Sequence, residues 1–309
     1  MSQTILTLTL NPAVDKSTTI DSLKPDKKLR CEKPVYEAGG GGINVSRGLV
    51  RLGISSTAFF TSGGPAGNRL QQLLDEEGVK AMPFPVKSET RENFMVVATN
   101  GNDQYRFGMP GSELNADEAE GIIKAIDSCN PEIAVISGSL PPGFEPKQMR
   151  TIIKNLKSKG AKVIIDTSGE ALQESLSEGV YLAKPNLGEL AKLVGVDELH
   201  NDDADDAAKE LINKGMAEMI VVSMGPQGAY LVTKDKTIHI PAPSVKKRTT
   251  VGAGDSMVAG IVAMMAKGEG ELAMARMGVA CGTAATMSTG TGLFKKEDVE
   301  RLYRWLAKL

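Results

Sequence analysis

The sequence predicts an α/β fold in which a mainly parallel central sheet carries helices on both faces. Short β-rich runs alternate with amphipathic helical patterns along most of the 309 residues, which is the pattern of parallel strands joined by crossover helices. Apolar residues make up 41% and charged residues 24% of the chain, which is typical of a globular protein and excludes a disordered one. No repeat, low-complexity tract or linker interrupts the pattern, so we expect one domain, residues 1–309.

The elements can be assigned in order along the chain. Buried strands are expected over Thr4–Leu10, Ser56–Thr61, Ile133–Ser137, Val163–Asp166, Tyr181–Ala183 and Met219–Val222. Amphipathic helices are expected over Ile43–Leu52, Asn68–Glu77, Ala116–Asp127, Pro146–Lys157 and Asp202–Asn213. An antiparallel pair, Ala229–Thr233 and Thr237–Ile240, then precedes the last helices. These are expected over Asp255–Ala266, Glu271–Met287 and Lys296–Ala307.

Two stretches break the alternation and are predicted as strands without a covering helix. They are Thr18–Tyr36 and Arg91–Gly108, and the second contains Asn100-Gly101, a strong hairpin signal. We expect them to form a small sheet that projects from the main body, with strands in about 17–37 and 90–109. A projecting sheet beside a site is suited to act as a lid or as a contact between two copies.

Charge, apolar runs and cysteine usage exclude several classes of protein. The formal net charge is −2, which disfavours a nucleic-acid binder with a broad basic face. The first residues lack the pattern of a secretion signal, and the longest apolar run, Met257–Ala266, is too short to span a bilayer. The 3 cysteines and 2 histidines show no zinc-binding spacing, and so few cysteines indicate a reducing cytoplasm.

The strongest motif is TTVGAGDS, Thr249–Ser256, followed at once by the apolar helical run MVAGIVAMMA. Its small residues Gly252, Ala253 and Gly254 let backbone amides turn toward one point, where the positive end of the following helix adds to the field. Such a pocket suits an anion. The carboxylate beside it, Asp255, fits a general base next to a transferred phosphoryl group. The alternative is that Asp255 only caps the helix.

A second glycine-rich turn, GGGGINVSR, spans Gly39–Arg47 and leads into a helix. The dinucleotide motif G-x-G-x-x-G fails there because its sixth position is Asn44, and a P-loop is disfavoured because the chain has no Gly-Lys pair. The glycines, among them Gly40 and Gly41, permit close approach of a polar ligand. Asn44 can donate to hydroxyls and accept from them. The alternative is an ordinary strand-to-helix turn.

Two further motifs follow predicted strands. KPNLGE begins at Lys184, and its Asn186 and Glu189 have the spacing of a capping box at the start of a helix. The same two side chains supply the oxygen atoms that suit hydrated Mg²⁺. SMGPQG, Ser223–Gly228, ends another strand in a tight turn, for which the alternative role is a simple hairpin.

Polar residues near the projecting strands are candidates for binding a sugar phosphate. Asp15 follows a strand in the turn LNPAVD, where a carboxylate can bind two sugar hydroxyls, and turn formation is its alternative role. Lys28 and Arg91 fall in the projecting strands, where cations can clamp a phosphate, Arg bidentately. Scattered surface charge is the alternative for both.

Together these motifs resemble those of the ribokinase-like, or PfkB-type, sugar kinases. TLNPAVD, GGGGINVSR, SGSLPPG, KPNLGE, SMGPQG and TTVGAGDS occur here in the order seen in that family, over essentially the whole chain. The resemblance implies a ribokinase-like three-layer sandwich with a small β lid. Within the family, KLRC, GGGGIN and QYRFGMPG are most similar to the minor bacterial 6-phosphofructokinases. 1-Phosphofructokinases and tagatose-6-phosphate kinases typically carry Lys at the position of Gly41, so Gly41 is expected to leave room that they fill.

The resemblance also implies a role for each matching residue. Asp255 is implied as the base for the C1 hydroxyl of the sugar, with the amides of residues 252–254 at the moving phosphoryl group. The residues implied at the sugar and its phosphate are Asp15, Lys28, Gly40, Gly41, Asn44, Arg91 and Ser139. Those implied at the nucleotide are Lys184, Asn186, Ser223, Gly225, Gly228 and Thr250. Glu189 is implied to order Mg²⁺ through water, and K⁺ is implied at Thr249, Val251, Ala285, Ser288 and Gly290.

The expected activity is ATP-dependent phosphorylation of fructose 6-phosphate at its C1 hydroxyl, giving fructose 1,6-bisphosphate. The same chemistry on fructose 1-phosphate or tagatose 6-phosphate is the first alternative, and a catalytically silent sugar-phosphate-binding regulator is the second. Mg²⁺ with ATP and K⁺ are the expected cofactors. We expect a homodimer joined through the lid strands, in the cytoplasm, with no nucleic-acid or membrane partner.

Overall fold

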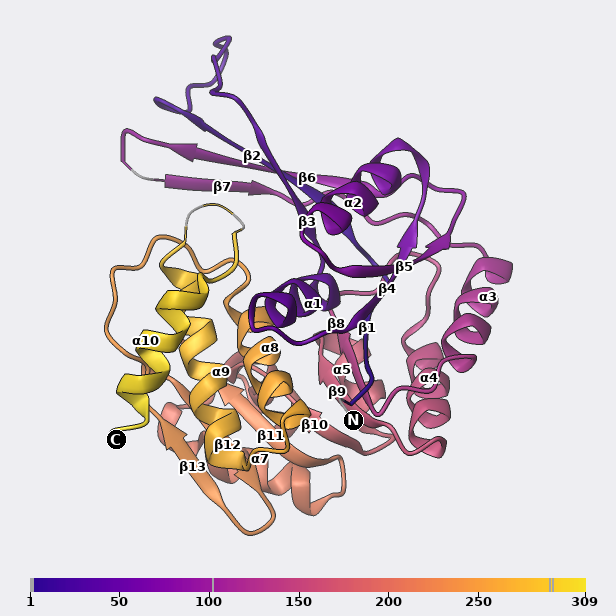
Figure 1. Ribbon diagram of the computed structural model, residues 1–309, viewed down its shortest axis with the longest axis vertical. Helices are drawn as coiled ribbons and strands as arrows, with labels where there is room; N and C mark the ends of the chain where they lie inside the picture. The colour runs from indigo at the N-terminus through magenta and orange to yellow at the C-terminus, as the bar shows by residue number, and fades with distance from the viewer. Residues whose placement is uncertain (1–2, 102, 289, 291) are drawn as a thin grey trace.

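The computed structural model describes residues 3–101, 103–288, 290 and 292–309, and its strands form two sheets (Figure 1). The larger sheet has nine strands in the order β13-β12-β11-β10-β9-β8-β1-β4-β5. Their bounds are β1 Ile5–Thr9, β4 Thr57–Ser62, β5 Lys80–Pro85, β8 Ile133–Ser137, β9 Lys162–Asp166, β10 Val180–Ala183, β11 Ala217–Ser223, β12 Ala229–Thr233 and β13 Thr237–Ile240. All neighbours pair in parallel except β11-β12 and β12-β13. The predicted mainly parallel sheet with an antiparallel end is therefore confirmed.

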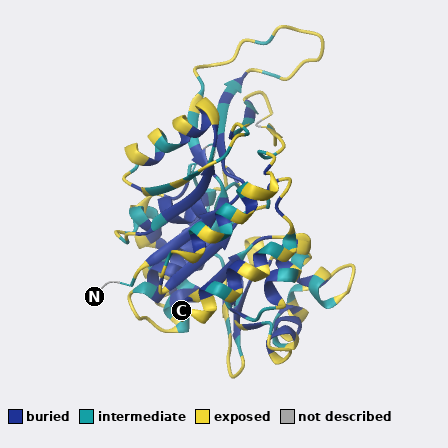
Figure 2. Cartoon of the chain, turned by 90° about the vertical axis from the view of Figure 1, so that its right-hand side faces the viewer, coloured by how far each residue is buried: buried dark blue, intermediate teal, exposed yellow. Residues whose placement is uncertain are grey.

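Helices cover both faces of this sheet. One face carries α1 Gly41–Arg51, α2 Gly64–Glu76, α8 Ala253–Ala266, α9 Glu271–Thr286 and α10 Lys296–Leu306. The other face carries α3 Ala116–Asp127, α4 Pro146–Ser158, α5 Gly169–Leu176, α6 Leu187–Val194 and α7 Ala204–Asn213. Successive strand residues enter opposite layers: Ile164 packs with α8 and α9, and Ile165 packs with α4 and α5. The central strands β1 and β8 are accordingly buried along their whole length, and the interior of the molecule is buried in Figure 2.

The second sheet has the strand order β3-β2-β6-β7 and projects from the main body (Figure 1). Its strands are β2 Ala13–Ile20, β3 Val35–Gly39, β6 Arg91–Ala98 and β7 Asp103–Phe107. The predicted hairpin at Asn100-Gly101 is confirmed, because β6 and β7 pair antiparallel across it. The prediction of strand through residues 21–34 is wrong: that segment has no ladder partner and forms the long arm at the top of Figure 1.

Two elements were not anticipated from the sequence. One is β5, whose sequence KAMPFP contains two prolines; it is the edge strand, where a missing N–H leaves no ladder bond unmade. The other is α5, a helix of only 8 residues. The α9 helix ends at Thr286 rather than Met287, and α8 begins at Ala253 rather than Asp255. The second difference places Asp255 inside the first helical turn.

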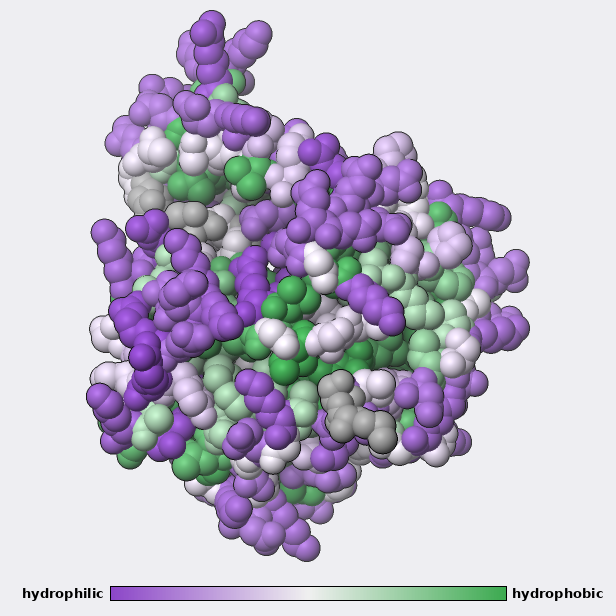
Figure 3. Space-filling model, viewed as in Figure 1, coloured by the Kyte–Doolittle hydropathy of each residue, from purple (hydrophilic) through white to green (hydrophobic). Residues whose placement is uncertain are grey.

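Polar and apolar surfaces are unevenly distributed on the molecule. Hydrophilic residues cover most of the face seen in Figure 3, and apolar residues gather near its middle, in the region of α1 and α8. Among the described residues, none of the helices has the length and apolar character needed to cross a membrane.

Candidate active site

The predicted site residues converge at the carboxyl ends of the parallel strands. Asp166 ends β9, Lys184 follows β10 and Ser223 ends β11. Asp255 faces them from the first turn of α8, and Asn44 from the first turn of α1. This edge is where ligands bind in open α/β sheets, because the loops that follow the strands meet there.

Asp255 lies in the first turn of α8, at the positive end of the helix dipole. The helix begins after Gly252, whose φ of 70° lies in the left-handed region, and it carries no side-chain cap. The Asp255 carboxylate does not serve as the cap, because its Oδ2 atom accepts a hydrogen bond from Nδ2 of Asn44 at 2.9 Å. No hydrogen bond from an α8 amide to the Asp255 carboxylate is among those of the described residues, so the alternative that Asp255 only caps the helix has no such bond to support it. In the first turn of α8 the Gly254 amide has no intrahelical partner, and the Ala253 amide donates to the Thr250 carbonyl oxygen at 3.5 Å.

The Asn44 side chain reaches Asp255 because of the glycine-rich turn before it. The turn ends at Gly40, with φ 118°, and a Cβ atom there would lie 2.5 Å from the Thr9 side chain. Only glycine fits this approach of the turn to β1. Asn44 is 8% exposed, and its Oδ1 atom accepts from Nη1 of Arg47 at 3.1 Å. The Asn44 amide is thus held from both ends.

Burial and the neighbouring carboxylates raise the pKa of Asp255. Burial is the largest cause, and repulsion from Asp166 is the next, while the bond from Asn44 and the charge of Lys184 act in the opposite direction. The resulting pKa is about 6, against 3.8 for the unperturbed side chain. Asp255 is therefore ionised at neutral pH and is a stronger base than an ordinary aspartate.

Lys184 forms a buried ion pair at this site. Its Nζ atom lies 3.1 Å from Oδ1 of Asp166, and Lys184 is 5% exposed. Burial is the largest single cause and lowers the pKa of Lys184. The charge and hydrogen bond of Asp166, together with the charges of Glu189 and Asp255, outweigh burial and raise the pKa overall, so the lysine stays protonated. Sequence reasoning missed Asp166; the available indication was a carboxylate at the end of a buried strand.

Asn186 and Glu189 form the capping box that their spacing predicts. The Asn186 Oδ1 atom accepts from the Glu189 amide, and Oε2 of Glu189 accepts from the Asn186 amide, both at 2.9 Å. A single parallel bridge joins Asn186 to Ser223, which brings the KPNLGE and SMGPQG motifs together. The SMGPQG turn closes on Gly228, where a Cβ atom would lie 2.0 Å from the Ile240 carbonyl oxygen.

Residues of the second sheet face the site from the opposite side. Asp15 lies within β2 and not in a turn, so the turn-forming role considered for it is wrong. Its Oδ1 atom accepts from Nδ2 of Asn93 at 2.8 Å, across the paired strand β6. Burial is the largest cause that raises the Asp15 pKa, and Asn93 opposes it. On the neighbouring strand, Arg106 reaches Oγ1 of Thr250 at 3.4 Å.

Arg91 is bound to backbone carbonyls. Its Nη2, Nη1 and Nε atoms donate to the carbonyl oxygens of Asn11 at 2.9 Å, Met109 at 3.1 Å and Pro12 at 3.3 Å. The Asn11 side chain in turn donates to Oγ of Ser139 at 3.0 Å, so Arg91 and Ser139 share one neighbourhood.

Lys28 lies apart from these residues. It is exposed in the long arm between β2 and β3.

The expectation that Gly41 leaves free space is wrong. A Cβ atom at Gly41 would lie 2.2 Å from Oγ of Ser137 and 2.7 Å from the Gly138 amide nitrogen. The end of β8 therefore occupies the space that a side chain would need. A larger residue fits only if that strand end moves.

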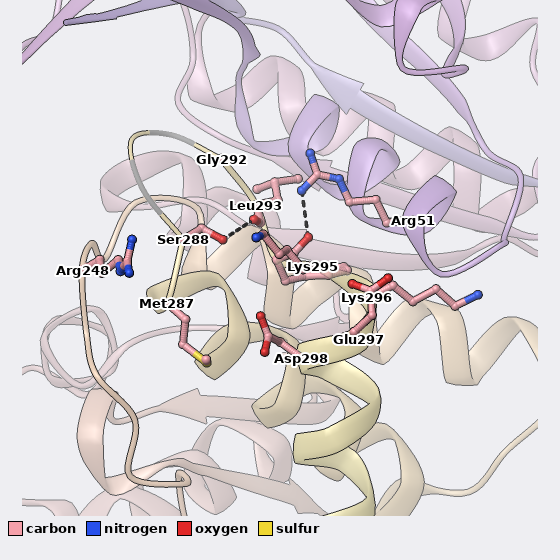
Figure 4. A pocket seen from close by; sticks show the side chains of 11 residues that line it. Arg51, Arg248, Met287, Ser288, Gly292, Leu293, Lys295, Lys296, Glu297 and Asp298 are labelled. Carbon is pink, nitrogen blue, oxygen red and sulfur yellow. Dashed lines mark hydrogen bonds between the residues drawn. The ribbon is translucent and has the colours of Figure 1, made fainter.

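The residues implied at K⁺ lie on two neighbouring segments. Thr286, at the end of α9, accepts from the amides of Arg248 at 2.8 Å and Thr249 at 3.2 Å, which joins the TTVGAGDS loop to α9. Oγ of Ser288 donates to the Leu293 carbonyl oxygen at 2.7 Å. That bond lies at the wall of a pocket of about 720 Å³, shown in Figure 4.

The donors available at these segments suit one class of ion better than another. Among the described residues there is no cluster of three or more His, Cys, Asp or Glu side chains that could hold a metal. The group formed by Thr249, Val251, Ala285, Ser288 and Gly290 offers backbone and hydroxyl oxygens instead. Neutral oxygen donors of this kind fit a monovalent cation rather than a transition metal.

Comparison with known proteins agrees with this site. The model of the pfkB family carbohydrate kinases matches residues 5–298. The chain is 42% identical to the ATP-dependent 6-phosphofructokinase isozyme 2 of Escherichia coli, over 98% of this chain and 99% of that protein. It is 33% identical to a 1-phosphofructokinase of Haloferax volcanii, over 96% of this chain and 95% of that protein.

The fold is similar to solved structures as well. The crystal structure of phosphofructokinase-2 from Escherichia coli in complex with potassium superposes with a TM-score of 0.95, covering 99% of this chain and 100% of that one. The two chains are 42% identical. Sequence motifs, sheet order and site geometry thus lead to one assignment: the chain belongs to the pfkB family of carbohydrate kinases.

Proposed function

We propose that the protein is an ATP-dependent 6-phosphofructokinase that converts fructose 6-phosphate and ATP to fructose 1,6-bisphosphate and ADP. The observation that carries this proposal is Asp255 in the first turn of α8, where its carboxylate accepts a hydrogen bond from Asn44 at 2.9 Å. A base next to an anion pocket is what transfer of a phosphoryl group to a hydroxyl requires. Identity of 42% with the Escherichia coli isozyme 2, over nearly both full lengths, supports the choice of substrate.

In the reaction we propose, Asp255 accepts the proton of the sugar C1 hydroxyl as that oxygen attacks the γ-phosphorus of ATP. The new C1–O–P bond forms while the bond from the γ-phosphorus to the β,γ-bridging oxygen breaks, and ADP leaves with that electron pair. The amides of Gly252, Ala253 and Gly254 stabilise the negative charge on the transferred group. The protein contributes positioning and charge stabilisation, since phosphoryl transfer needs little covalent work.

The remaining site residues are proposed in the roles that the family resemblance implies. Asp15, Gly40, Gly41 and Asn44 bind the sugar hydroxyls, and Lys28, Arg91 and Ser139 lie near its phosphate or hydroxyls. Lys184, Asn186, Ser223, Gly225, Gly228 and Thr250 bind the nucleotide. In the proposed arrangement Lys184 neutralises phosphate charge, because it stays protonated beside Asp166.

Two cations complete the proposal. Glu189 would hold Mg²⁺ through water; its Oε2 atom serves the α6 cap, and its carboxylate is partly exposed beside Lys184. Bound Mg²⁺ would neutralise charge on the triphosphate. The oxygens of Thr249, Val251, Ala285, Ser288 and Gly290 would hold K⁺, which agrees with the potassium complex of the related Escherichia coli enzyme.

We further propose a homodimer, formed by the apolar outer face of the second sheet, and a cytoplasmic location. The dimer proposal rests on Phe107, which is 44% exposed and stacks on Phe94 with ring centroids 6.2 Å apart. The location rests on free cysteines at positions 31, 129 and 281, as in a reducing compartment.

A kinase assay on a panel of phosphosugars tests the proposed function. We expect the highest kcat/KM with fructose 6-phosphate, ahead of fructose 1-phosphate and tagatose 6-phosphate. The Asp255→Asn variant should lose about 10²–10⁴-fold in kcat, because the amide cannot accept the proton. A preference for fructose 1-phosphate would favour the 1-phosphofructokinase alternative, for which the Haloferax volcanii relative is the supporting observation. Turnover of no sugar phosphate would contradict kinase function.

A further inference from the structure

Arg47 is a buried charged residue that the proposed reaction does not use. Arg47 lies on α1 one turn after Asn44, and it is 2% exposed. It is among the largest fully buried side chains among the described residues. A buried guanidinium is costly unless each of its donors has a partner, so its partners identify its role.

The guanidinium of Arg47 binds three elements at once. Its Nε and Nη2 atoms lie 2.8 Å and 2.7 Å from Oε1 of Glu77, at the end of α2. Its Nη1 atom donates to the Ala38 carbonyl oxygen of β3 at 2.6 Å and to Oδ1 of Asn44 at 3.1 Å. Nη2 also lies 3.6 Å from Oε1 of Glu37. The group is therefore fixed in place by carboxylate and carbonyl oxygens on α2 and β3.

These contacts decide which way the Asn44 amide faces. A guanidinium only donates, so the Asn44 atom beside it must be the oxygen, which leaves Nδ2 for Asp255. The reversed amide would set two donors against each other at Arg47 and two acceptors against each other at Asp255. Arg47 thus selects the single orientation in which Asn44 donates to the carboxylate.

We propose that Arg47 is a positioning residue for phosphoryl transfer: it holds the Asn44 amide so that Nδ2 stabilises and orients the Asp255 carboxylate. This inference rests on the proposed role of Asp255 as the base. Asp255 is faced by Asp166 from β9 and Asp15 from β2, which repel its charge, and by Lys184 after β10, which attracts it. Asn44 supplies its hydrogen bond from α1.

Arg51 provides a matched control on the same helix. It also contacts Glu77, with Nη2 at 3.4 Å from Oε2, and it donates to the Phe294 carbonyl oxygen at 2.9 Å (Figure 4). No contact joins Arg51 to Asn44 among those of the described residues. If Arg47 only tied α1 to α2, substitution of either arginine would act alike.

The test compares Arg47→Lys, Arg51→Lys, Asn44→Ala and the double variant Arg47→Lys/Asn44→Ala. The lysine keeps the charge beside Glu77 but lacks the planar fork that binds Glu77 and Asn44 together. We expect Arg47→Lys to lower kcat about threefold to tenfold and to move the acid limb of kcat upward by about half a pH unit. Arg51→Lys should leave both quantities close to wild type. In the Asn44→Ala background the effect of Arg47→Lys on kcat should vanish, because Arg47 acts through Asn44.

Provided that the wild-type enzyme is active, three outcomes would contradict the proposed role of Arg47. They are an unchanged kcat and acid limb in Arg47→Lys, equal effects of the two lysine variants, and an undiminished Arg47→Lys effect in the Asn44→Ala background. An inactive wild type, or a fully active Asp255→Asn variant, would instead contradict the proposed function. If Arg47→Lys does not fold, Arg47→Met/Glu77→Met removes both charges together and is expected to show the same loss of kcat.

Discussion

At the scale of single residues, the surroundings of Asp255 raise its pKa and so make its carboxylate a stronger base. Burial and the neighbouring Asp166 and Asp15 raise its pKa, and Asn44 and Lys184 limit the rise to a pKa of about 6. A lower pKa would weaken the base, and a higher one would leave it protonated at neutral pH. The opposing contributions keep Asp255 both ionised and basic.

This raised pKa predicts how activity and stability depend on pH. We expect kcat to fall as the pH drops below about 6, since protonated Asp255 cannot act as the base. The folded state binds this proton more tightly than the unfolded state, whose pKa is near 3.8, so Asp255 lowers stability as pH rises from about 4 to about 6. Asp255→Asn should therefore raise the free energy of unfolding at pH 8 by on the order of 1–3 kcal/mol.

Thermal unfolding of wild type and Asp255→Asn at several pH values measures this difference. The gain should shrink as the pH falls below about 6 and approach zero below about pH 3, where Asp255 is neutral in both states. A gain that stays constant over the whole range would show that the Asp255 charge is not its source.

Arg91 has two functions to separate. Its three bonds to carbonyls tie β6 to Asn11, Pro12 and Met109, and its remaining donors are proposed to bind the sugar phosphate. Arg91→Ala should raise KM for fructose 6-phosphate about tenfold or more, with little change in KM for ATP. It should also lower the free energy of unfolding by on the order of 2 kcal/mol, because backbone bonds are lost. Kinetics and denaturant unfolding check the two effects, and an unchanged sugar KM would leave Arg91 with the structural function alone.

At the scale of elements, the start of α6 joins a structural role to a proposed chemical one. Glu189 closes the capping box with Asn186 and is the proposed Mg²⁺ residue. Gln serves a capping box as well as Glu does, but it carries no charge. Glu189→Gln should therefore keep the wild-type melting temperature while needing more Mg²⁺ for half-maximal activity, by about threefold to tenfold. Titration of activity with free Mg²⁺ measures this requirement. The control is Glu189→Ala, which also loses the helix cap. Equal Mg²⁺ requirements in wild type and Glu189→Gln would refute the metal role.

The elements that could be predicted from sequence are those with a strong local pattern. The alternation of apolar strands and amphipathic helices identified the parallel sheet, and Asn-Gly identified the β6-β7 hairpin. Residues 21–34 were assigned to strand against their own composition, because they include Pro25 and Pro34 and no β-branched or aromatic residue. The β5 strand escaped notice because proline is tolerated only at an edge, and edge position is a property of the assembled sheet.

The same limit applies to the candidate site. Asp255 and Asn44 were found because each stands inside a distinctive glycine-rich motif. Asp166 stands in no such motif, and Arg47 ends the glycine-rich motif without a role that its sequence position reveals. The importance of both residues comes from partners on other elements, Lys184 and Glu77. The occupied space at Gly41 depends on the end of β8 and likewise appears only after folding.

At the scale of the whole molecule, the second sheet has two different faces. Ile20, Val96 and Ala98 form a small apolar cluster on its outer face, with Phe94 and Tyr105 packed against it. The inner face, with Val35 and Met95, borders a pocket of about 820 Å³ that Lys246, Lys247 and Arg248 also line. A two-sided sheet of this kind can serve a partner on one face and the site on the other.

The proposed dimer uses the outer face, so a charge there should dissociate it. Phe107→Lys should shift the protein from dimer to monomer on dilution, because a lysine cannot be buried against an apolar partner. The control is Val35→Lys, a charge on the inner face at a residue that is 56% exposed. Light scattering after size-exclusion chromatography measures the mass of both. A dimer that survives Phe107→Lys unchanged would place the interface elsewhere.

The position of β1 between β8 and β4 in the large sheet has a consequence for synthesis on the ribosome. Leu6 pairs with Thr57 of β4 on one side and with Ala134 of β8 on the other. The first side can form early, but the second waits until more than a third of the chain has been translated. Until β8 emerges, the nascent chain presents an open apolar strand edge, which is a template for mispairing. In the interval between translation of β4 and translation of β8, β1 therefore has only one of its two neighbouring strands.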